Sequence, residues 1–280
     1  RTRTPDGHRL TPAAADLYYS RQRLWPGFLA ELRALAVRTV ALAGDARLVF
    51  VGRSPESVYD YLAGALAATA WSDRCALLSI SLGDRGPETP AGLAALRAHL
   101  RALDLAPARI ASAPRPIALV DLIWKGRTFG ALSSLLAEWA REEGVDVAAV
   151  RRRLRWVGIT VRTKNSPRTW RWFQQLEWTR DYPRSALRGI SIDDWMWTFL
   201  GDAQHKTMVQ NHAGRWGSDE LREPPRDGDT LNALRNAYEI HAHARTPEER
   251  ARFAAGLAAR VEMREPWLRS LVVALRRGAG

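Results

Sequence analysis

The sequence predicts an α/β fold in which a mostly parallel sheet is covered by helices on both faces. Two observations predict it. Four short apolar runs, each about as long as a buried strand, occur at residues 47–51, 75–82, 117–122 and 156–161. Helical patterns of apolar residues separate these runs, and strands that alternate with helices are typical of parallel sheets.

Helices are expected before, between and after these strands. The pattern at 11–43 predicts a helix that Pro26 divides into two. Ser54 and Pro55 predict the N-cap and the first position of a helix that ends near residue 70. Further helices are expected at 91–103, at 128–143 and, with breaks near Pro247 and Pro266, at 230–277.

The predicted order of strands and helices divides the chain into three segments. We expect residues 1–46 to form helices of a hood, residues 47–165 the α/β core, and residues 166–280 a Trp-rich segment with C-terminal helices. Two interpretations of the Trp-rich segment stay open: a small core that covers the sheet, or a wall that stacks on the ring of a ligand. Its tryptophans are Trp170, Trp172, Trp178, Trp195, Trp197 and Trp216.

The composition indicates a protein without transmembrane helices and with a strong excess of positive charge. The net charge is +12 over 280 residues, and only three of the 42 basic residues are lysines. This excess fits either the arginine bias of a GC-rich genome or an anionic partner, with a phosphorylated small molecule ahead of nucleic acid. The polar N-terminus and the single Cys75 predict no signal peptide and no internal disulfide, so we expect a cytoplasmic protein.

Two of the strands end in residues that suit anion binding. After the first strand, Gly52 allows a tight turn and Arg53 supplies a forked positive charge ahead of a helix. After the third strand, Asp121 closes the apolar run, and residues 124–129 lead into the next helix. Backbone amides at helix starts bind phosphate, so the two strand ends together favour an anion site over plain turns.

The segment 121–129 resembles the phosphoribosyl pyrophosphate signature of type I phosphoribosyltransferases. Asp121 matches the second acid of that signature, and Gly126 and Thr128 match its phosphate loop. Residues 51–54 are similar to the family's pyrophosphate loop, and the turn-rich stretch 83–90 stands where the family places a mobile loop. The resemblance covers about residues 47–162.

The resemblance implies a function and a set of site residues. The protein would transfer 5-phosphoribosyl from phosphoribosyl pyrophosphate to a small acceptor with the help of Mg²⁺. Arg53 and Mg²⁺ would stabilise the pyrophosphate leaving group, with Gly52 and Ser54 in the same loop. Asp121 would hold the ribose hydroxyls and contact the metal. The 5-phosphate would lie on Lys125, Gly126, Arg127, Thr128 and Phe129.

The sequence also differs from the family signature. Val120 replaces its first acid, Trp124 and Lys125 replace an acid and a small residue, and Arg127 replaces a glycine. These differences keep two alternatives open: a non-catalytic module that binds a nucleotide or phosphosugar, and a nucleic-acid-binding protein. A stripe along Arg151, Arg152, Arg153, Arg155, Arg168 and Arg171 would favour nucleic acid.

Acceptor recognition is expected outside the core. Trp195 and Trp197 offer stacking surface, and Asp193 and Asp194 offer carboxylates or, alternatively, cap a helix. The acceptor would be a nucleobase, or a hydroxyl or amine of a specialised bacterial metabolite such as an aminoglycoside. Whether the protein is a homodimer stays open. His205, Lys206, Asn211 and His212 would supply a general base or line a polar loop.

Overall fold

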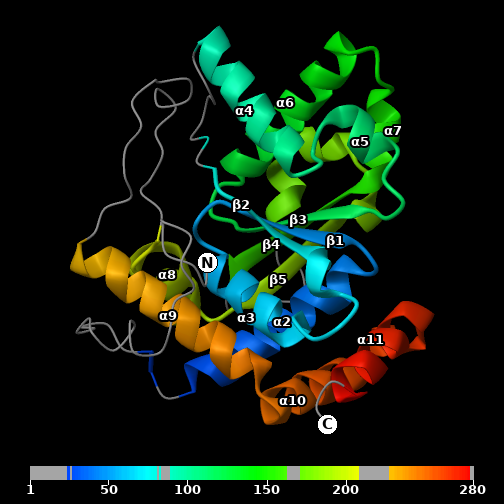
Figure 1. The fold of residues 1–280 in the computed structure, drawn as a ribbon. Coiled ribbons are helices and arrows are strands. Elements are labelled where there is room, and N and C mark those ends of the chain that lie inside the picture. Colours follow the sequence, from blue (N-terminus) through cyan, green and yellow to red (C-terminus); the bar gives the residue numbers. More distant parts are fainter. Residues whose placement is uncertain are drawn as a thin grey trace.

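The computed structural model describes residues 24–25, 27–80, 82, 89–162, 171–207 and 227–277. A five-stranded, wholly parallel sheet in the order β2-β1-β3-β4-β5 forms its centre (Figure 1). The α/β fold with a parallel sheet is therefore confirmed. The strands are β1 (Arg47–Val51), β2 (Cys75–Leu78), β3 (Ile117–Leu122), β4 (Leu154–Val161) and β5 (Leu187–Ile192).

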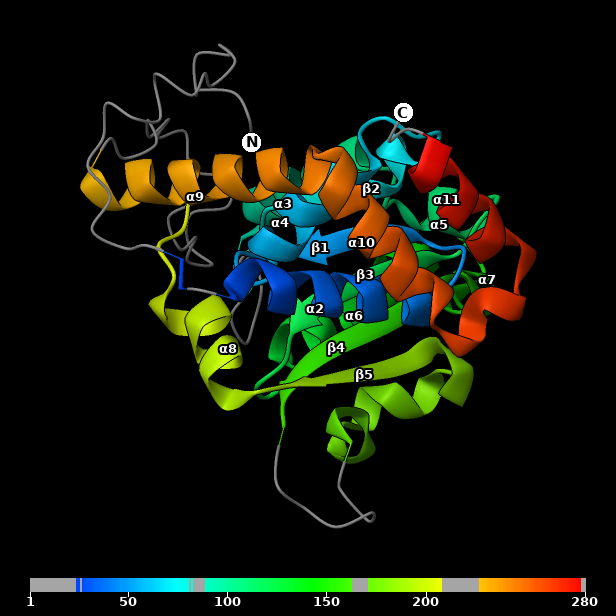
Figure 2. The same cartoon turned by 90° about the horizontal axis from the view of Figure 1, so that it is seen from below.

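Helices cover both faces of this sheet (Figures 1 and 2). One face carries α2 (Phe28–Ala43), α3 (Glu56–Leu66), α9 (Gly228–Arg245), α10 (Pro247–Ala258) and α11 (Pro266–Arg277). The opposite face carries α4 (Pro90–Ala102), α5 (Pro107–Ala111), α6 (Arg127–Glu142) and α7 (Val147–Arg153). A short helix, α8 (Asp194–Thr198), follows β5 and continues into a π-helical turn, η5 (Phe199–Ala203).

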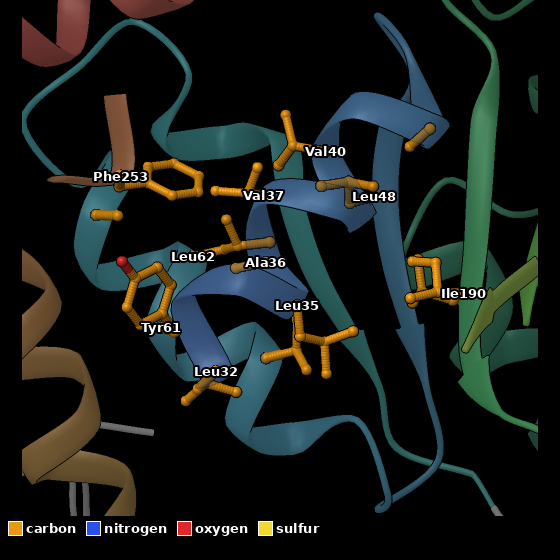
Figure 3. Close-up of a cluster of buried hydrophobic side chains, with 14 of the residues drawn as sticks. Leu32, Leu35, Ala36, Val37, Val40, Leu48, Tyr61, Leu62, Ile190 and Phe253 are labelled. Carbon is orange, nitrogen blue, oxygen red and sulfur yellow. The ribbon is translucent and has the colours of Figure 1, made fainter. Parts of the chain in front are cut away.

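Each face of the sheet has its own apolar core. Figure 3 shows the first core, where Leu35 of α2, Leu62 of α3 and Phe253 of α10 have no exposed surface. Successive residues of a strand point to opposite faces, so Val120 of β3 joins this core while Leu119 joins the other. Burial of β3 from both sides explains the continuous apolar run at 117–120.

The strands differ from the prediction at three places. β1 and β3 have the predicted bounds, whereas β2 ends at Leu78 instead of residue 82, and β4 begins two residues early, at Leu154. β5 was not predicted, because Arg188 and Gly189 interrupt its apolar pattern at the edge of the sheet. The sheet thus extends past residue 165, where we expected the core to end.

One predicted helix start is wrong and another is confirmed. α3 begins at Glu56 with Pro55 as its N-cap residue, and Ser54 makes no capping hydrogen bond, so the predicted Ser54 cap is wrong. The predicted start of α10 is confirmed: Thr246 accepts a hydrogen bond from the Glu249 amide at 3.3 Å. The predicted helix before residue 24 and most of the stretch 83–90 lie outside the described residues.

A buried carboxylate joins four of the helices on the first face. Glu249 of α10 has no exposed surface and accepts hydrogen bonds from Arg33 of α2 at 2.8 and 2.9 Å. It also accepts from the Tyr61 hydroxyl of α3 at 2.9 Å and lies 3.3 Å from His243 of α9. Buried charge needs such partners, so Glu249 fixes the packing of these helices on one another.

Among the helices of the described ranges, none has the length and apolar character needed to cross a bilayer.

Candidate functional site

The strand order places a topological switch point at the ends of β1 and β3. From β1 the chain crosses to β2 on one side, whereas from β3 it crosses to β4 on the other side. The connections therefore diverge where β1 and β3 pair, with Phe50 opposite Val120. Ligands of open α/β sheets bind outside the carboxyl ends of strands at such a point. The two anion-binding loops that the sequence predicts follow these two strands.

A cleft of about 310 Å³ opens at the end of β3. Its lining comes from one continuous segment, which covers the end of the strand, the loop and the start of α6. The residues are Asp121, Leu122, Ile123, Trp124, Lys125, Gly126, Arg127 and Thr128. All the predicted phosphate-loop residues except Phe129 therefore line the same cleft as Asp121.

The first turn of α6 begins at this cleft. The first intrahelical bond at this end runs from the Gly130 amide to the Gly126 carbonyl, so the amides of 127–129 precede the hydrogen-bonded ladder. The first turn of this 16-residue helix holds no acidic residue, and Lys125 and Arg127 are exposed beside it. The helix dipole and these two cations favour a phosphate at this position.

Phe129 lies next to the cleft in the sequence but does not line it. Its ring is fully buried and packs against the indoles of Trp156 at 4.9 Å and Trp172 at 5.8 Å between centroids. This packing holds the first turn of α6 against the sheet, so the amides of the turn have a fixed direction.

Gly126 allows the loop to close on α6. Its φ is +66°, in the left-handed region that favours glycine, and a Cβ built on it lies 2.4 Å from Cδ1 of Leu176. Gly144 has nearly the same φ, +67°, but a Cβ there meets nothing within 4 Å. Both glycines thus adopt the left-handed backbone conformation, but only at Gly126 would a side chain also collide with a neighbouring residue.

We expect the variant Gly126→Ala to bind phosphate more weakly, because the new methyl group meets Leu176 and either that side chain or the loop must shift. Gly144→Ala is the matched control, since the left-handed conformation costs both variants about 1 kcal/mol. Calorimetric titration with inorganic phosphate measures the affinity, and thermal melting measures stability. Equal phosphate affinity in the two variants would contradict the role of the loop.

Asp121 is buried at the base of the cleft. Its side chain is 7% exposed, and burial raises its pKa well above the ordinary value, against the opposing effect of a hydrogen bond from the Leu122 amide. Its neighbour across the sheet is Gly158, and the indole of Trp172 fills the space that a Cβ on Gly158 would take. A carboxyl group in such surroundings favours its neutral form.

The loop after β1 has the turn that its sequence predicts. Gly52 adopts φ +74°, and its amide donates to the Leu78 carbonyl of β2 at 2.9 Å. Arg53 and Ser54 are half-buried in this loop. The buried carboxylate of Glu56 already lies in the first turn of α3, so an anion here would contact Arg53 and the loop in preference to the α3 amides.

The two candidate acceptor tryptophans point in different directions. Because they lie two positions apart on α8, they do not share a helix face. Trp195 contacts Trp25 with ring centroids 3.8 Å apart, whereas Trp197 lies 5.5 Å from Trp124, a lining residue of the cleft that is 71% exposed. The two indoles therefore do not lie on one face, and Trp197 is the one beside the cleft.

The candidate acceptor carboxylates lie at the start of α8. Asp193 occupies the N-cap position but makes no capping hydrogen bond, and its carboxylate pairs with Arg162 at 3.3 Å. Asp194 is exposed in the first turn. Both carboxylates follow β5, so they lie at the carboxyl edge of the sheet, as the cleft does.

Other aromatic residues of the Trp-rich segment form core. Trp172 and Trp178 pack with Trp156 and Tyr182 on the α6 face of the sheet, which fits the core interpretation for these two indoles. Trp170 and Trp216 lie outside the described residues.

The polar residues after α8 serve local structure. His205 lies 2.9 Å from the Asn232 amide group, and Lys206 donates to the Leu200 carbonyl at 2.6 Å. Asn211 and His212 lie outside the described residues.

Among the described residues that line the cleft, Asp121 is the one acidic side chain. Within the described ranges, no group of three or more His, Cys, Asp or Glu residues is arranged to hold a metal. Mg²⁺ in nucleotide sites is often held by one or two carboxylates together with substrate phosphates and water. The residues of the cleft thus fit Mg²⁺ only as a complex with a phosphorylated ligand.

The arginines considered for nucleic-acid binding are partly neutralised. Arg151 pairs with Asp181 at 2.6 Å, Arg152 with Asp146 at 3.4 Å, and Arg155 with Asp45 at 3.6 Å. Arg168 lies outside the described residues. These ion pairs reduce the positive charge that a phosphate backbone would meet along this stretch.

Comparisons of the chain with protein-family models, curated proteins and solved structures gave no significant match. The function is therefore inferred from the residues and the geometry of the cleft.

Proposed function

We propose that the protein is a phosphoribosyltransferase-like enzyme that transfers 5-phosphoribosyl from phosphoribosyl pyrophosphate to a small acceptor. The observation that carries this proposal is the position of the cleft. It joins a buried acid to the first turn of a helix, at the point where the strand order reverses. A phosphosugar needs these two kinds of contact, with hydroxyl groups at one end and a phosphate at the other.

Different residues bind different parts of the donor. The amides of 127–129, with Lys125 and Arg127, bind the 5-phosphate, which places the ribose over Asp121. Arg53, on the loop after the neighbouring strand, contacts the pyrophosphate. Catalysis then consists of positioning and charge stabilisation, because the protein forms no covalent bond to the donor.

The transfer breaks one bond and forms another. The bond from the anomeric carbon to the pyrophosphate oxygen breaks, and its electron pair leaves with pyrophosphate. A nitrogen or oxygen of the acceptor forms the new bond to that carbon and gives its proton to solvent. Asp121 acts as its carboxylate in this step, because the ribose ring gains positive charge as the leaving group departs.

Magnesium enters this proposal as part of the donor complex. When bound, it supplies positive charge that stabilises the departing pyrophosphate. Asp121 is the residue of the cleft that would contact it, since carboxylate oxygens are preferred ligands of Mg²⁺.

A binding module without transfer activity is the second candidate. Two observations favour it: Val120 fills the position of the first acid with a fully buried apolar side chain, and burial raises the pKa of Asp121. Such a module would bind the phosphosugar through the same amides. Release of pyrophosphate in the presence of an acceptor separates the two candidates, since only the enzyme produces it.

We expect Arg53→Ala to weaken the binding of phosphoribosyl pyrophosphate, and the difference from the wild type to shrink in high salt. The contact is a charge-assisted hydrogen bond, which salt partly screens. Titration calorimetry at about 50 and 500 mM salt gives the two affinities. Arg276→Ala, an exposed change on α11, is the control. If both variants bind as the wild type does, Arg53 has no part in the donor site.

The position of Trp197 beside Trp124 predicts its part in acceptor binding. We expect Trp197→Ala to raise the acceptor KM about tenfold, since stacking contributes about 1 kcal/mol in addition to buried area. Trp195→Ala serves as the comparison, because that ring faces Trp25. Steady-state kinetics with an acceptor selected from a panel of nucleobases and aminoglycosides measures both constants. A larger effect of Trp195→Ala would mean that the acceptor lies on the other side of α8.

A further inference from the structure

A second and larger pocket lies at the amino ends of the strands, opposite the cleft at Asp121. Its volume is about 700 Å³, and its lining includes Arg47 and Ile117, the first residues of β1 and β3. Strands of five or six residues rise roughly 20 Å from one edge of the sheet to the other. In Figure 2 the elements near this pocket, α5 and α11, lie at the far end of the sheet from α8. The pocket is therefore separate from the cleft at Asp121.

Four arginines from three segments of the chain converge on this pocket. Arg47 begins β1, Arg74 ends a short 3₁₀ helix before β2, and Arg109 and Arg115 flank the end of α5. The described lining holds two aspartates against these four arginines, and Asp104 lies 3.4 Å from Arg109. The lining therefore carries an excess of positive charge.

Carbonyl oxygens hold two of these guanidinium groups in place. Nη1 of Arg47 donates to the Leu103 carbonyl at 2.8 Å, and Nη2 of Arg74 donates to the Ala46 carbonyl at 2.6 Å. A carbonyl fixes the direction of a guanidinium group but does not neutralise it. Both groups are thus preorganised and keep their charge for a ligand.

Arg74 is the most constrained of the four. Burial, and then the nearby charge of Arg115, lower its pKa to about 10, and Nε is buried with no hydrogen-bond partner among the residues that the structure describes. Its guanidinium lies 4.0 Å from the ring centroid of Trp71, and that of Arg115 lies 5.6 Å from the same ring. Stacking on the indole holds the two like charges near each other at the wall of the pocket.

We propose that this pocket binds a small phosphorylated molecule with at least two negative charges. Guanidinium groups match phosphate oxygens with paired hydrogen bonds, and an anion between Arg74 and Arg115 replaces their repulsion by attraction. A volume of about 700 Å³ lies within the range of small-molecule sites and accommodates a ligand of nucleotide size. The site is independent of the donor cleft, because no residue lines both.

Inorganic pyrophosphate is the probe that tests this site. Titration calorimetry compares the wild type with Arg115→Glu. This variant reverses the charge of an exposed lining residue that makes no described backbone contact. Arg276→Glu makes the same change of charge on α11, at a residue that does not line the pocket, and Arg53→Ala removes the contact with the donor that the proposed function expects. Circular dichroism verifies that each variant is folded.

We expect Arg115→Glu to weaken one class of pyrophosphate binding at least about tenfold, as loss of a charged hydrogen bond implies. Arg276→Glu should keep this binding, and so should Arg53→Ala. Arg109→Glu repeats the test at a second lining residue. The proposal is overturned if Arg115→Glu and Arg109→Glu bind as the wild type does. It is equally overturned if Arg276→Glu causes the same loss, or if Arg53→Ala abolishes all binding.

Discussion

Replacement of Asp121 by Asn should lower turnover at least about 100-fold and leave the protein no less stable. In the proposed mechanism, Asp121 interacts as a carboxylate with charge that develops on the ribose, and an amide cannot replace that interaction. In the folded protein without ligand, however, burial disfavours the charged form of this side chain. If the proposal holds, Asp121 contributes to the reaction at a cost to the stability of the fold, as many active-site groups do.

The effect of Asp121 on stability depends on pH in a defined direction. The pKa of its carboxyl group is raised in the fold above the ordinary value of 3.8, so the free energy of unfolding falls as the pH rises from near 4 through the raised pKa. The amide side chain of the variant carries no charge and escapes this loss. The melting temperature of Asp121→Asn should therefore equal or exceed that of the wild type at pH 8, and the difference should shrink toward pH 4.

Two measurements check this prediction. Pyrophosphate release gives turnover, and thermal melts at several pH values give stability. Glu138→Gln, which makes the same change from carboxylate to amide at an exposed position of α6, is the control and should change neither quantity by much. A folded Asp121→Asn protein with normal turnover would remove Asp121 from the mechanism. A large drop in melting temperature at pH 8 would show that Asp121 is structural.

Truncation of Glu249 to Ala should destabilise the protein by about 3 kcal/mol or more. The change leaves the Arg33 guanidinium and the Tyr61 hydroxyl without their partner at the junction of α2, α3, α9 and α10. A buried group that loses its partner keeps the cost of desolvation, which is why removal of one member costs more than the pair contributes.

Urea unfolding measures this loss of stability. Glu249→Gln should lose less, because the amide oxygen still accepts hydrogen bonds from Arg33 and Tyr61. Glu248→Ala, at the exposed neighbouring position, should change stability by less than about 0.5 kcal/mol. A loss below about 1 kcal/mol for Glu249→Ala would mean that the four helices pack without this ion pair.

The sequence predicts the centre of this fold better than its margins. β1 and β3 are buried on both faces, so each is a continuous apolar run whose ends are visible in the sequence. β5 is an edge strand with Arg188 and Gly189 in its middle, and it has no such pattern. α5 has five residues and α7 seven, which is too short for a helical period to stand out.

The candidate site was predictable where its residues are consecutive in the sequence. Asp121 and the residues that follow form one strand, loop and helix start, so the sequence places them together. The burial of Asp121 beside Gly158 and Trp172 depends on strand pairing and on a distant segment. The contact of Trp124 with Trp197, and the meeting of Arg47, Arg74, Arg109 and Arg115 in one pocket, likewise arise only from the tertiary fold.

A crystal structure of the protein with phosphoribosyl pyrophosphate and Mg²⁺ would test the central claim most directly. The proposal predicts density for the 5-phosphate over the amides of 127–129, with the ribose hydroxyls within hydrogen-bond distance of Asp121 and the pyrophosphate toward Arg53. Gly126→Ala protein treated in the same way should show weaker density in the cleft. A donor bound elsewhere in the wild type, with the start of α6 unoccupied, would contradict the proposed phosphoribosyl site.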